Sequence, residues 1–122
     1  MSKLSTWAGE IEARRAAVLG LTTWGLSATE LLAAYAAGVR DFSEADLTGA
    51  DLHWANLTRA NLRGADLTET KLSWATLTGA SLTEAKLMKT DLNWANLTRA
   101  DLRGTDLTRA KLRWATLTGA LF

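Results

Sequence analysis

The stretch ADLTGADLHWANLTRANLRGADLTE, residues 45–69, places a large apolar residue at every fifth position. The repeat starts at Phe42 and continues without a break to Phe122; Leu occupies 15 of its 17 positions and Phe the two ends. A small residue precedes each position from Leu47 on by two places, and it is Ala in 13 of 16 cases. The predicted core positions are Phe42, Leu47, Leu52, Leu57, Leu62, Leu67, Leu72, Leu77, Leu82, Leu87, Leu92, Leu97, Leu102, Leu107, Leu112 and Leu117.

A period of five fits neither regular element of secondary structure. On an α-helix, five residues advance by about 500°, so the leucines would be spread over all sides of the helix. In a strand, side chains alternate between the two faces, so successive leucines would point to opposite faces. All of them stay inside only if the chain turns a corner once per repeat and always in the same direction. One Leu and one small residue per side can then fill a narrow interior.

A second period of 20 residues is superimposed on the first. Tryptophan returns at 20-residue intervals from Trp54 to Trp114, and threonine does so from Thr58 to Thr118. Four repeats per turn predict a square cross-section, in which equivalent residues of successive coils stack in columns. Residues 41–120 supply about four such coils, and backbones stacked as in a parallel sheet lie about 4.8 Å apart.

The repeat units resemble a known family. ADLTG, ANLTR, ANLRG, ADLRG and TDLTR are similar to the pentapeptide-repeat consensus A(D/N)LXX. This resemblance covers about two thirds of the chain and implies an all-β solenoid: a right-handed quadrilateral β-helix with the central Leu or Phe and the preceding Ala inside. The activities of the family are diverse, so the resemblance is specific for fold and uninformative for function.

The residues before the repeats differ in composition from the rest, and we predict a helical segment over 1–40 followed by the β-helix over 41–122. Apolar residues recur near one helical face and predict an appended helix over about 5–19. Charged residues surround that face and also interrupt any signal-peptide core. The apolar face consists of Leu4, Trp7, Ile11 and Val18.

A second helix is predicted over about 27–37. Ser27 and Glu30 form a capping-box pattern, and Gly38 suits the left-handed position that ends a helix. The run ELLAAYAAGVRDF resembles the lead-in of cyanobacterial pentapeptide-repeat proteins, in which a short helix covers the N-terminal end of the solenoid. A cover is needed because an end coil exposes its leucines and an unpaired backbone edge. The residues expected to supply it are Leu31, Leu32, Tyr35 and Val39.

The opposite end shows no covering segment, since the five-residue register continues to the last residue. Three alternatives follow: Phe122 folds over the end as a plug, another molecule covers the end, or the natural protein is longer. Leu121 and Phe122 are therefore candidate interface residues, and a homodimer through this end is one expected assembly.

Trp54, Trp74, Trp94 and Trp114 are predicted to form an exposed aromatic strip. One interpretation is a purely stabilising ladder, because cross-strand contacts contribute a few tenths to about 1 kcal/mol per pair. A second interpretation is an interaction site, since contiguous apolar surface usually marks one. In the third, the appended helix folds back over the strip. Beside it, the alternation of Asp and Lys from Asp51 to Lys111 is expected to act as a stacking and register device.

The chain carries no pattern that predicts catalysis, a metal site or a cofactor. It has no cysteine, one histidine and no glycine-rich phosphate loop. Lys and Arg number 14 and Asp and Glu 13, so no strong field of one sign attracts nucleic acid. No run is long and apolar enough to span a membrane. The absence of cysteine favours a reducing compartment, and we predict a cytoplasmic protein with no nucleic-acid or membrane partner.

Two functions remain for comparison. The first is a non-enzymatic structural or interaction module, a rigid rod that binds a protein or copies of itself. The second comes from the resemblance alone: some members of the family protect DNA gyrase by imitating duplex DNA with an acidic rod. Residues 41–122 carry ten Asp and Glu and ten Lys and Arg. This balance argues against the second function, because a DNA mimic needs charge of one sign.

Overall fold

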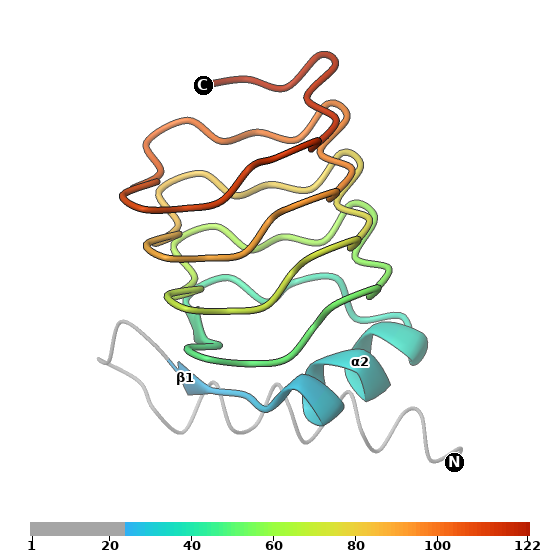
Figure 1. Cartoon of the computed structure of the whole chain (residues 1–122). Coiled ribbons are helices and arrows are strands. Elements are labelled where there is room, and N and C mark those ends of the chain that lie inside the picture. The colour runs from blue at the N-terminus through green and yellow to red at the C-terminus, as the bar shows by residue number, and fades with distance from the viewer. Residues whose placement is uncertain (1–23) are drawn as a thin grey trace, which may run out of the picture.

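The computed structural model describes residues 24–122, which form a stack of coils above one short helix (Figure 1). The appended helix predicted over about 5–19 lies outside the described residues. The elements are β1 (Trp24–Gly25), α2 (Ala28–Ala36) and β2 (Ala45–Asp46). The rest of the coil backbone consists of turns and isolated bridges, because the chain changes direction after every two or three extended residues.

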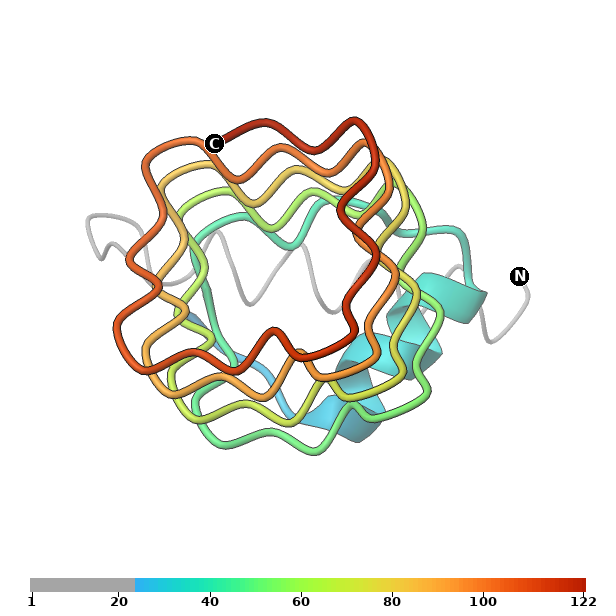
Figure 2. The ribbon, with the colours of Figure 1, turned by 45° about the horizontal axis from the view of Figure 1, so that its top comes forward.

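Parallel bridges join residues 20 positions apart, such as Asp51 with Lys71, and they recur from Asp41 to Leu121. Viewed along the stack, the coils have a roughly square outline and lie in register above one another (Figure 2). The hydrogen bonds run between coils: the Leu62 amide donates to the carbonyl of Ser81 at 2.8 Å, and the Ser81 amide donates to the carbonyl of Ala60 at 3.0 Å. Each coil therefore uses its neighbours as the strands of a parallel sheet.

Every corner is a tight turn with a left-handed residue. At a typical corner, the carbonyl of Leu47 accepts a hydrogen bond from the Ala50 amide at 3.0 Å, and Gly49 has a φ of 70°. A positive φ at the third residue is the mark of a type II turn, which favours glycine. Eleven of the sixteen corner residues from Glu44 to Gly119 are nevertheless not glycine. The left-handed corners are a feature that the repeat pattern did not predict, although glycine at five of them was a signal for it.

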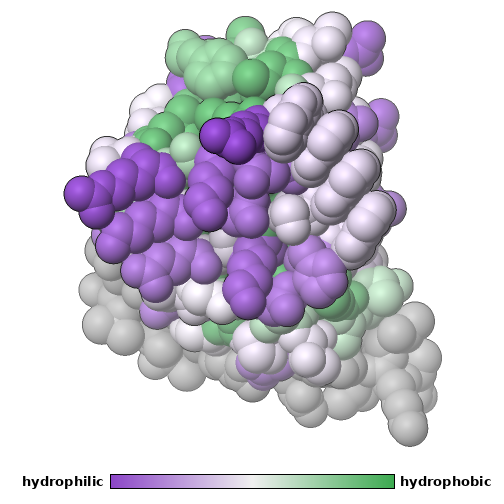
Figure 3. Space-filling model, in the orientation of Figure 1, coloured by the Kyte–Doolittle hydropathy of each residue, from purple (hydrophilic) through white to green (hydrophobic). Residues whose placement is uncertain are grey.

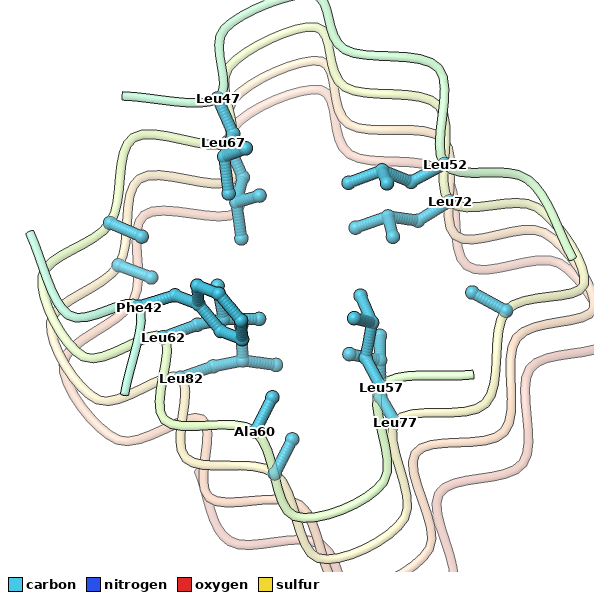
Figure 4. Close-up of a cluster of buried hydrophobic side chains, with 14 of the residues drawn as sticks. Phe42, Leu47, Leu52, Leu57, Ala60, Leu62, Leu67, Leu72, Leu77 and Leu82 are labelled. Carbon is cyan, nitrogen blue, oxygen red and sulfur yellow. The ribbon is translucent and has the colours of Figure 1, made fainter. Parts of the chain in front are cut away.

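The core lies along the axis of the stack, where the leucine side chains converge from all four sides (Figure 4). Leucines of the middle coils, including Leu67 and Leu77, are fully buried, and each contributes about 1.5–3 kcal/mol relative to an exposed side chain. Thr70 and Thr90 stand where most repeats have Ala and are also fully buried. Their hydroxyls donate to the carbonyls of Leu47 and Leu67 in the coil below, at 2.9 and 2.7 Å, so no polar group is left unsatisfied.

Helix α2 is capped at both ends by local hydrogen bonds. The Ser27 hydroxyl accepts from the Glu30 amide, and the Glu30 carboxylate accepts from the Ser27 amide, so the predicted capping box is present. At the other end, Gly38 adopts a φ of 100° and the Val39 amide donates to the carbonyl of Ala34 at 3.0 Å. This is the Schellman arrangement, in which the left-handed residue reverses the chain and satisfies a helix carbonyl.

Helix α2 covers the first coil with one of its faces. Leu31 is fully buried, and Tyr35 and Val39 pack against the core while partly exposed. The Tyr35 hydroxyl donates to the carbonyl of Thr58 at 3.0 Å, a group on the lower edge of the first coil. The prediction that Leu32 belongs to this cover is wrong: its exposed fraction is 40%. One residue corresponds to about 100° of helix rotation, so Leu32 points away when Leu31 points inward.

Strand β1 extends the sheet by a partial layer below the first coil. It pairs in parallel with β2, and the Leu26 amide donates to the carbonyl of Asp46 at 3.2 Å. Leu26 is buried beneath the stack. The sequence analysis did not identify this core position, because Leu26 precedes Leu47 by 21 residues and is therefore one residue out of the five-residue register.

Candidate functional site

Four tryptophans form a stacked column along one edge of the rod, which we call the indole column: Trp54, Trp74, Trp94 and Trp114. Successive ring centroids lie 4.8–4.9 Å apart, and the ring planes differ by only 3–18°. All four residues are exposed: the exposed fraction is 65% for Trp54 and 63% for Trp114 at the ends, and 43% for both Trp74 and Trp94 in the centre. The space-filling view shows pale, plate-like side chains in a row on this surface (Figure 3).

The backbone explains the position of the indole column. All four tryptophans are corner residues with φ values of 58–65°, so the 20-residue period places them directly above one another. The spacing of their centroids equals the spacing of stacked strands and falls within the range that offset-stacked aromatic pairs prefer. Such pairs contribute about 0.5–1.5 kcal/mol each beyond buried area, which offsets the strain of a bulky residue at positive φ.

The surroundings of the indole column are polar. Ser73 and Asn93 precede the two central tryptophans in the chain. In the last coil, the guanidinium of Arg113 lies 6.0 Å from the ring centroid of Trp114. None of the four indole N–H groups donates a hydrogen bond within residues 24–122. The alternative in which the first helix covers the column depends on residues outside the described range.

The second candidate surface is the C-terminal end of the stack, which we call the open end: Leu107, Leu112, Leu117, Leu121 and Phe122. The first three are predicted core positions, and they are only partly buried, whereas the equivalent leucines of the middle coils are fully buried. Leu121 is 49% exposed and Phe122 66%, so Phe122 does not act as a plug. Apolar surface is visible at this end in Figure 3.

The backbone at the open end is also unpaired. In the coil below, the Leu87 amide donates to the carbonyl of Asp106 and the Leu92 amide to that of Lys111. Among residues 24–122, the equivalent amides of Leu107 and Leu112 have no backbone acceptor. The end therefore combines exposed apolar side chains with a free sheet edge, which is a template for pairing with another chain.

The charged columns differ from their prediction. The Asp–Lys column from Asp51 to Lys111 is joined by backbone bridges, but no ion pair links its members within the described part of the chain. Ion pairs lie on other columns instead, for example between Lys89 and Glu69 at 3.8 Å. These side chains are more than half exposed, so such a pair contributes about 0–1 kcal/mol. The alternation avoids stacking like charges without forming ion pairs among the described residues.

The aspartates of the repeats interact locally. Oδ1 of Asp46 accepts from the Thr48 hydroxyl at 2.7 Å and from its amide at 3.1 Å, and these hydrogen bonds lower the pKa of Asp46. His53 lies 2.5 Å from Asp51 through Nδ1, and this contact is the main reason that the pKa of Asp51 is lowered. Both carboxylates therefore stabilise the extended side of a coil, as Asx turns do, and neither has the raised pKa of a general acid.

Residues 24–122 contain no group of three His, Asp or Glu side chains that could hold a metal ion. A depression of about 500 Å³ near the open end is lined by Asn93, Ala110, Lys111, Leu112 and Arg113, without a carboxylate that could act as a base beside the Lys111 amine. No helix in this part of the chain has the length and apolar character needed to cross a bilayer.

Comparison with protein-family models identifies pentapeptide repeats in 8 copies, over residues 41–64, 55–93, 65–104 and 85–122. No protein with a curated description matches the chain. Among solved structures, QnrB1, a plasmid-mediated fluoroquinolone resistance protein, is 22% identical with a TM-score of 0.62. HetL, from the cyanobacterium Nostoc sp. strain PCC 7120 and involved in heterocyst differentiation regulation, is 40% identical with a TM-score of 0.39. A pentapeptide repeat protein of the Arabidopsis thaliana thylakoid lumen is 29% identical with a TM-score of 0.44.

These matches cover 66% of this chain in each case, but only 39% of QnrB1, 39% of HetL and 60% of the thylakoid protein. The chain thus spans about two fifths of the length of QnrB1 and HetL. The likeness to QnrB1 shows a shared fold and nothing beyond it. Together with the repeat matches, it confirms the predicted pentapeptide-repeat solenoid.

Proposed function

Because the chain belongs to the pentapeptide-repeat family, we propose that it is a non-enzymatic interaction module. In this proposal, residues 41–122 form a rigid right-handed quadrilateral rod of about four coils that binds a protein partner or a second copy of itself. The observation that carries the proposal is the large apolar surface that the described residues expose, at the indole column and at Leu121 and Phe122.

Self-association through the open end has both apolar and hydrogen-bonding support. Side chains that are buried in the middle coils are partly exposed there, and the amides of Leu107 and Leu112 lack backbone acceptors in the described residues. Helix α2 packs against the first coil at the other end, so that end offers less apolar surface for a head-to-tail contact. A symmetric pair in which two open ends face each other satisfies both conditions and closes the assembly at a dimer.

The indole column supports a second contact surface on the same rod. Contiguous exposed aromatic area is common at interaction sites, and rings held by stacking lose little conformational freedom on binding. The column lies on the side of the rod and the open end at its tip, so one surface can be occupied while the other is free.

The absence of a catalytic arrangement in the described residues supports a non-enzymatic role. Leucine and alanine fill the interior of the rod, and the aspartates with resolved shifts have lowered rather than raised pKa values. Imitation of DNA, the alternative suggested by the resemblance, is disfavoured. The repeat region carries ten acidic and ten basic residues, so its surface lacks the uniform negative charge of a duplex.

The proposal is tested by the solution mass of the full chain, measured by light scattering behind a sizing column at two concentrations. We expect a dimer whose population rises with concentration. Replacing both Leu121 and Phe122 with Ser should yield a monomer, because the apolar contact between the two open ends is lost. The fold should be preserved, because both side chains are exposed. Arg59→Gly, at a corner on the side of the rod, is the matched control and should remain dimeric. A monomer at both concentrations would contradict self-association.

A further inference from the structure

The indole column presents ring edges to the solvent. Trp74 is stacked between Trp54 and Trp94, and Trp94 between Trp74 and Trp114, so neighbours cover both faces of each central ring. The central rings are nevertheless 43% exposed, and this exposed surface is therefore mainly edge. Aromatic rings carry partial positive charge at the edge and partial negative charge on the face. The column is thus a row of four weakly positive edges on a rigid frame.

We infer that the indole column binds one extended, planar, conjugated molecule that lies along the rod axis with its π face against the indole edges. The inference deepens the proposal that the column is a contact surface, because it names the chemistry of the occupant. Each indole edge would make an edge-to-face contact with the negative π face of the ligand, which is one of the two favoured aromatic geometries. A conjugated molecule as long as three ring spacings of 4.8–4.9 Å contacts all four indoles at once.

The residues that flank the two central tryptophans in the chain favour an uncharged ligand at the centre of the column. Ser73 and Asn93 precede the two central tryptophans, and Thr76 and Asn96 follow two positions after them. None of these four side chains is charged, so a neutral molecule meets no charge from them at the centre of the column. At the last layer, the Arg113 guanidinium lies 6.0 Å from the ring centroid of Trp114. The indole N–H groups have no partner in residues 24–122 and can donate to a hydroxyl or carbonyl on the ligand.

The same geometry argues against a polysaccharide. The C–H groups of sugar rings are attracted to the negative faces of aromatic rings, and these faces are covered at the two central positions. The outer faces of Trp54 and Trp114 remain, but they lie at opposite ends of the column.

The composition of the corners gives independent support. The corner column that contains Arg59 also contains glycine, and so do the other two, whereas the indole column has the same bulky residue in all four layers. The corner backbone has positive φ throughout, a conformation that favours glycine. A uniform run of tryptophan at these positions is therefore not a requirement of the turn, and it builds one continuous aromatic surface on this side of the rod.

The test uses the full chain and an uncharged arylbenzothiazole dye of the thioflavin type as the probe. Dye fluorescence is titrated at fixed protein concentration, and co-elution with protein of the mass found without dye excludes binding to aggregates. We expect saturation near one dye per rod, with an affinity of about micromolar. Trp74→Gly should weaken binding about tenfold and Trp74→Gly with Trp94→Gly should abolish it. Glycine is compatible with positive φ, so these variants should fold.

The double variant Arg59→Gly with Arg99→Gly is the matched control, since it places two glycines at equivalent corners of another column. The affinity of this variant for the dye should be unchanged. No saturable binding, or equal binding by the double tryptophan variant, would overturn the inference. Loss of binding in the Leu121 and Phe122 variant alone would also overturn it, because the dye would then occupy the open end. The mass of each variant without dye is measured in parallel, so failure of this inference can be told apart from failure of self-association.

Discussion

The two ends of the rod are built from the same repeat, but their leucines are buried to different extents. At the N-terminal end, Leu47 and Leu52 are almost fully buried because α2 and the segment after β1 lie beneath the first coil. At the other end, Leu112 and Leu117 occupy equivalent positions in the repeat and remain partly exposed. In a solenoid, a residue is buried by the layer above and the layer below it, so burial depends on neighbours as well as on the residue itself.

The comparison also separates local from long-range interactions. Asp46 in the first coil and Asp106 in the last make the same pair of hydrogen bonds, to Thr48 and Thr108 respectively. These contacts span two residues and need no neighbouring coil. The two ends are therefore alike in their turns and side-chain hydrogen bonds and unlike in their packing. This distinction predicts that substitutions in the packing between coils cost far more stability than substitutions in the turns.

A charged side chain at a core position should unfold the protein when it lies in a middle coil and should be tolerated at the open end. Leu72→Asp places an unpaired carboxylate at a fully buried position, which costs several kcal/mol and should unfold the chain. Leu117→Asp should leave a folded protein, because its side chain can reach water. Thr78→Asp, on the outer surface, is the control. Circular dichroism and urea unfolding measure the folding of the three variants. Equal stability of Leu72→Asp and Thr78→Asp would show that the inward-facing and outward-facing positions of the repeat are wrongly assigned.

The cover at the N-terminal end should depend on one face of α2. Leu31→Ala removes a fully buried side chain and should lower the free energy of unfolding by about 2–5 kcal/mol. Leu32→Ala changes the adjacent, exposed position and should alter it by less than about 0.5 kcal/mol. Chemical unfolding of both variants provides the measurement. Similar losses for the two would mean that α2 does not cover the first coil with the Leu31 face.

Substitutions at left-handed corner residues should change the stability of the fold in the same way at both ends of the rod. Gly49 and Arg109 lie on one corner column, in the first and last coils, with φ of 70° and 59°. Gly49→Ala meets no neighbouring atom, so its cost of about 1 kcal/mol should come from backbone strain alone. Arg109→Gly should be neutral or stabilise by up to about 1 kcal/mol. Thermal unfolding tests both; a stabilising Gly49→Ala would contradict the left-handed assignment.

The aspartate hydrogen bonds should give the smallest effect. The pKa values of Asp46 and Asp106 are lowered, chiefly by the hydroxyls of Thr48 and Thr108. A lowered folded-state pKa stabilises the fold above the ordinary value of 3.8, and this contribution is lost as pH falls through the lowered pKa. NMR titration of the carboxyl carbons should show low midpoints at both positions. Thr48→Val and Thr108→Val should each raise the midpoint of their own aspartate; no change in either would contradict the assignment.

Much of the interior could be predicted because the five-residue period has only one geometric solution. Phe42 and Leu62 follow directly from that period and are fully buried. The capping box of α2 was also readable, since it is a contact over three residues. Strand β1 and the position of Leu26 were not, because their pairing partner lies about 20 residues away and outside the repeat register. The exposure of Leu32 was missed because apolar content alone does not define the orientation of a helix.

The candidate surfaces were predicted in position and not in geometry. The 20-residue period placed the tryptophans in one column, but whether their rings stack depends on the positive φ of the corners and on the rotamers that neighbouring coils allow. The Asp–Lys alternation predicted proximity between layers, yet the side chains prefer local partners such as His53 and do not bridge the layers.

The positions where leucine and alanine recur are sufficient to predict the solenoid, its period and the side of each repeat that faces inward. How completely each leucine is buried, which face of α2 covers the first coil and how the indoles meet became known from the folded chain alone. The difference follows from distance along the chain. A turn is specified by residues within reach of one another, whereas burial and stacking depend on a layer that is 20 residues away.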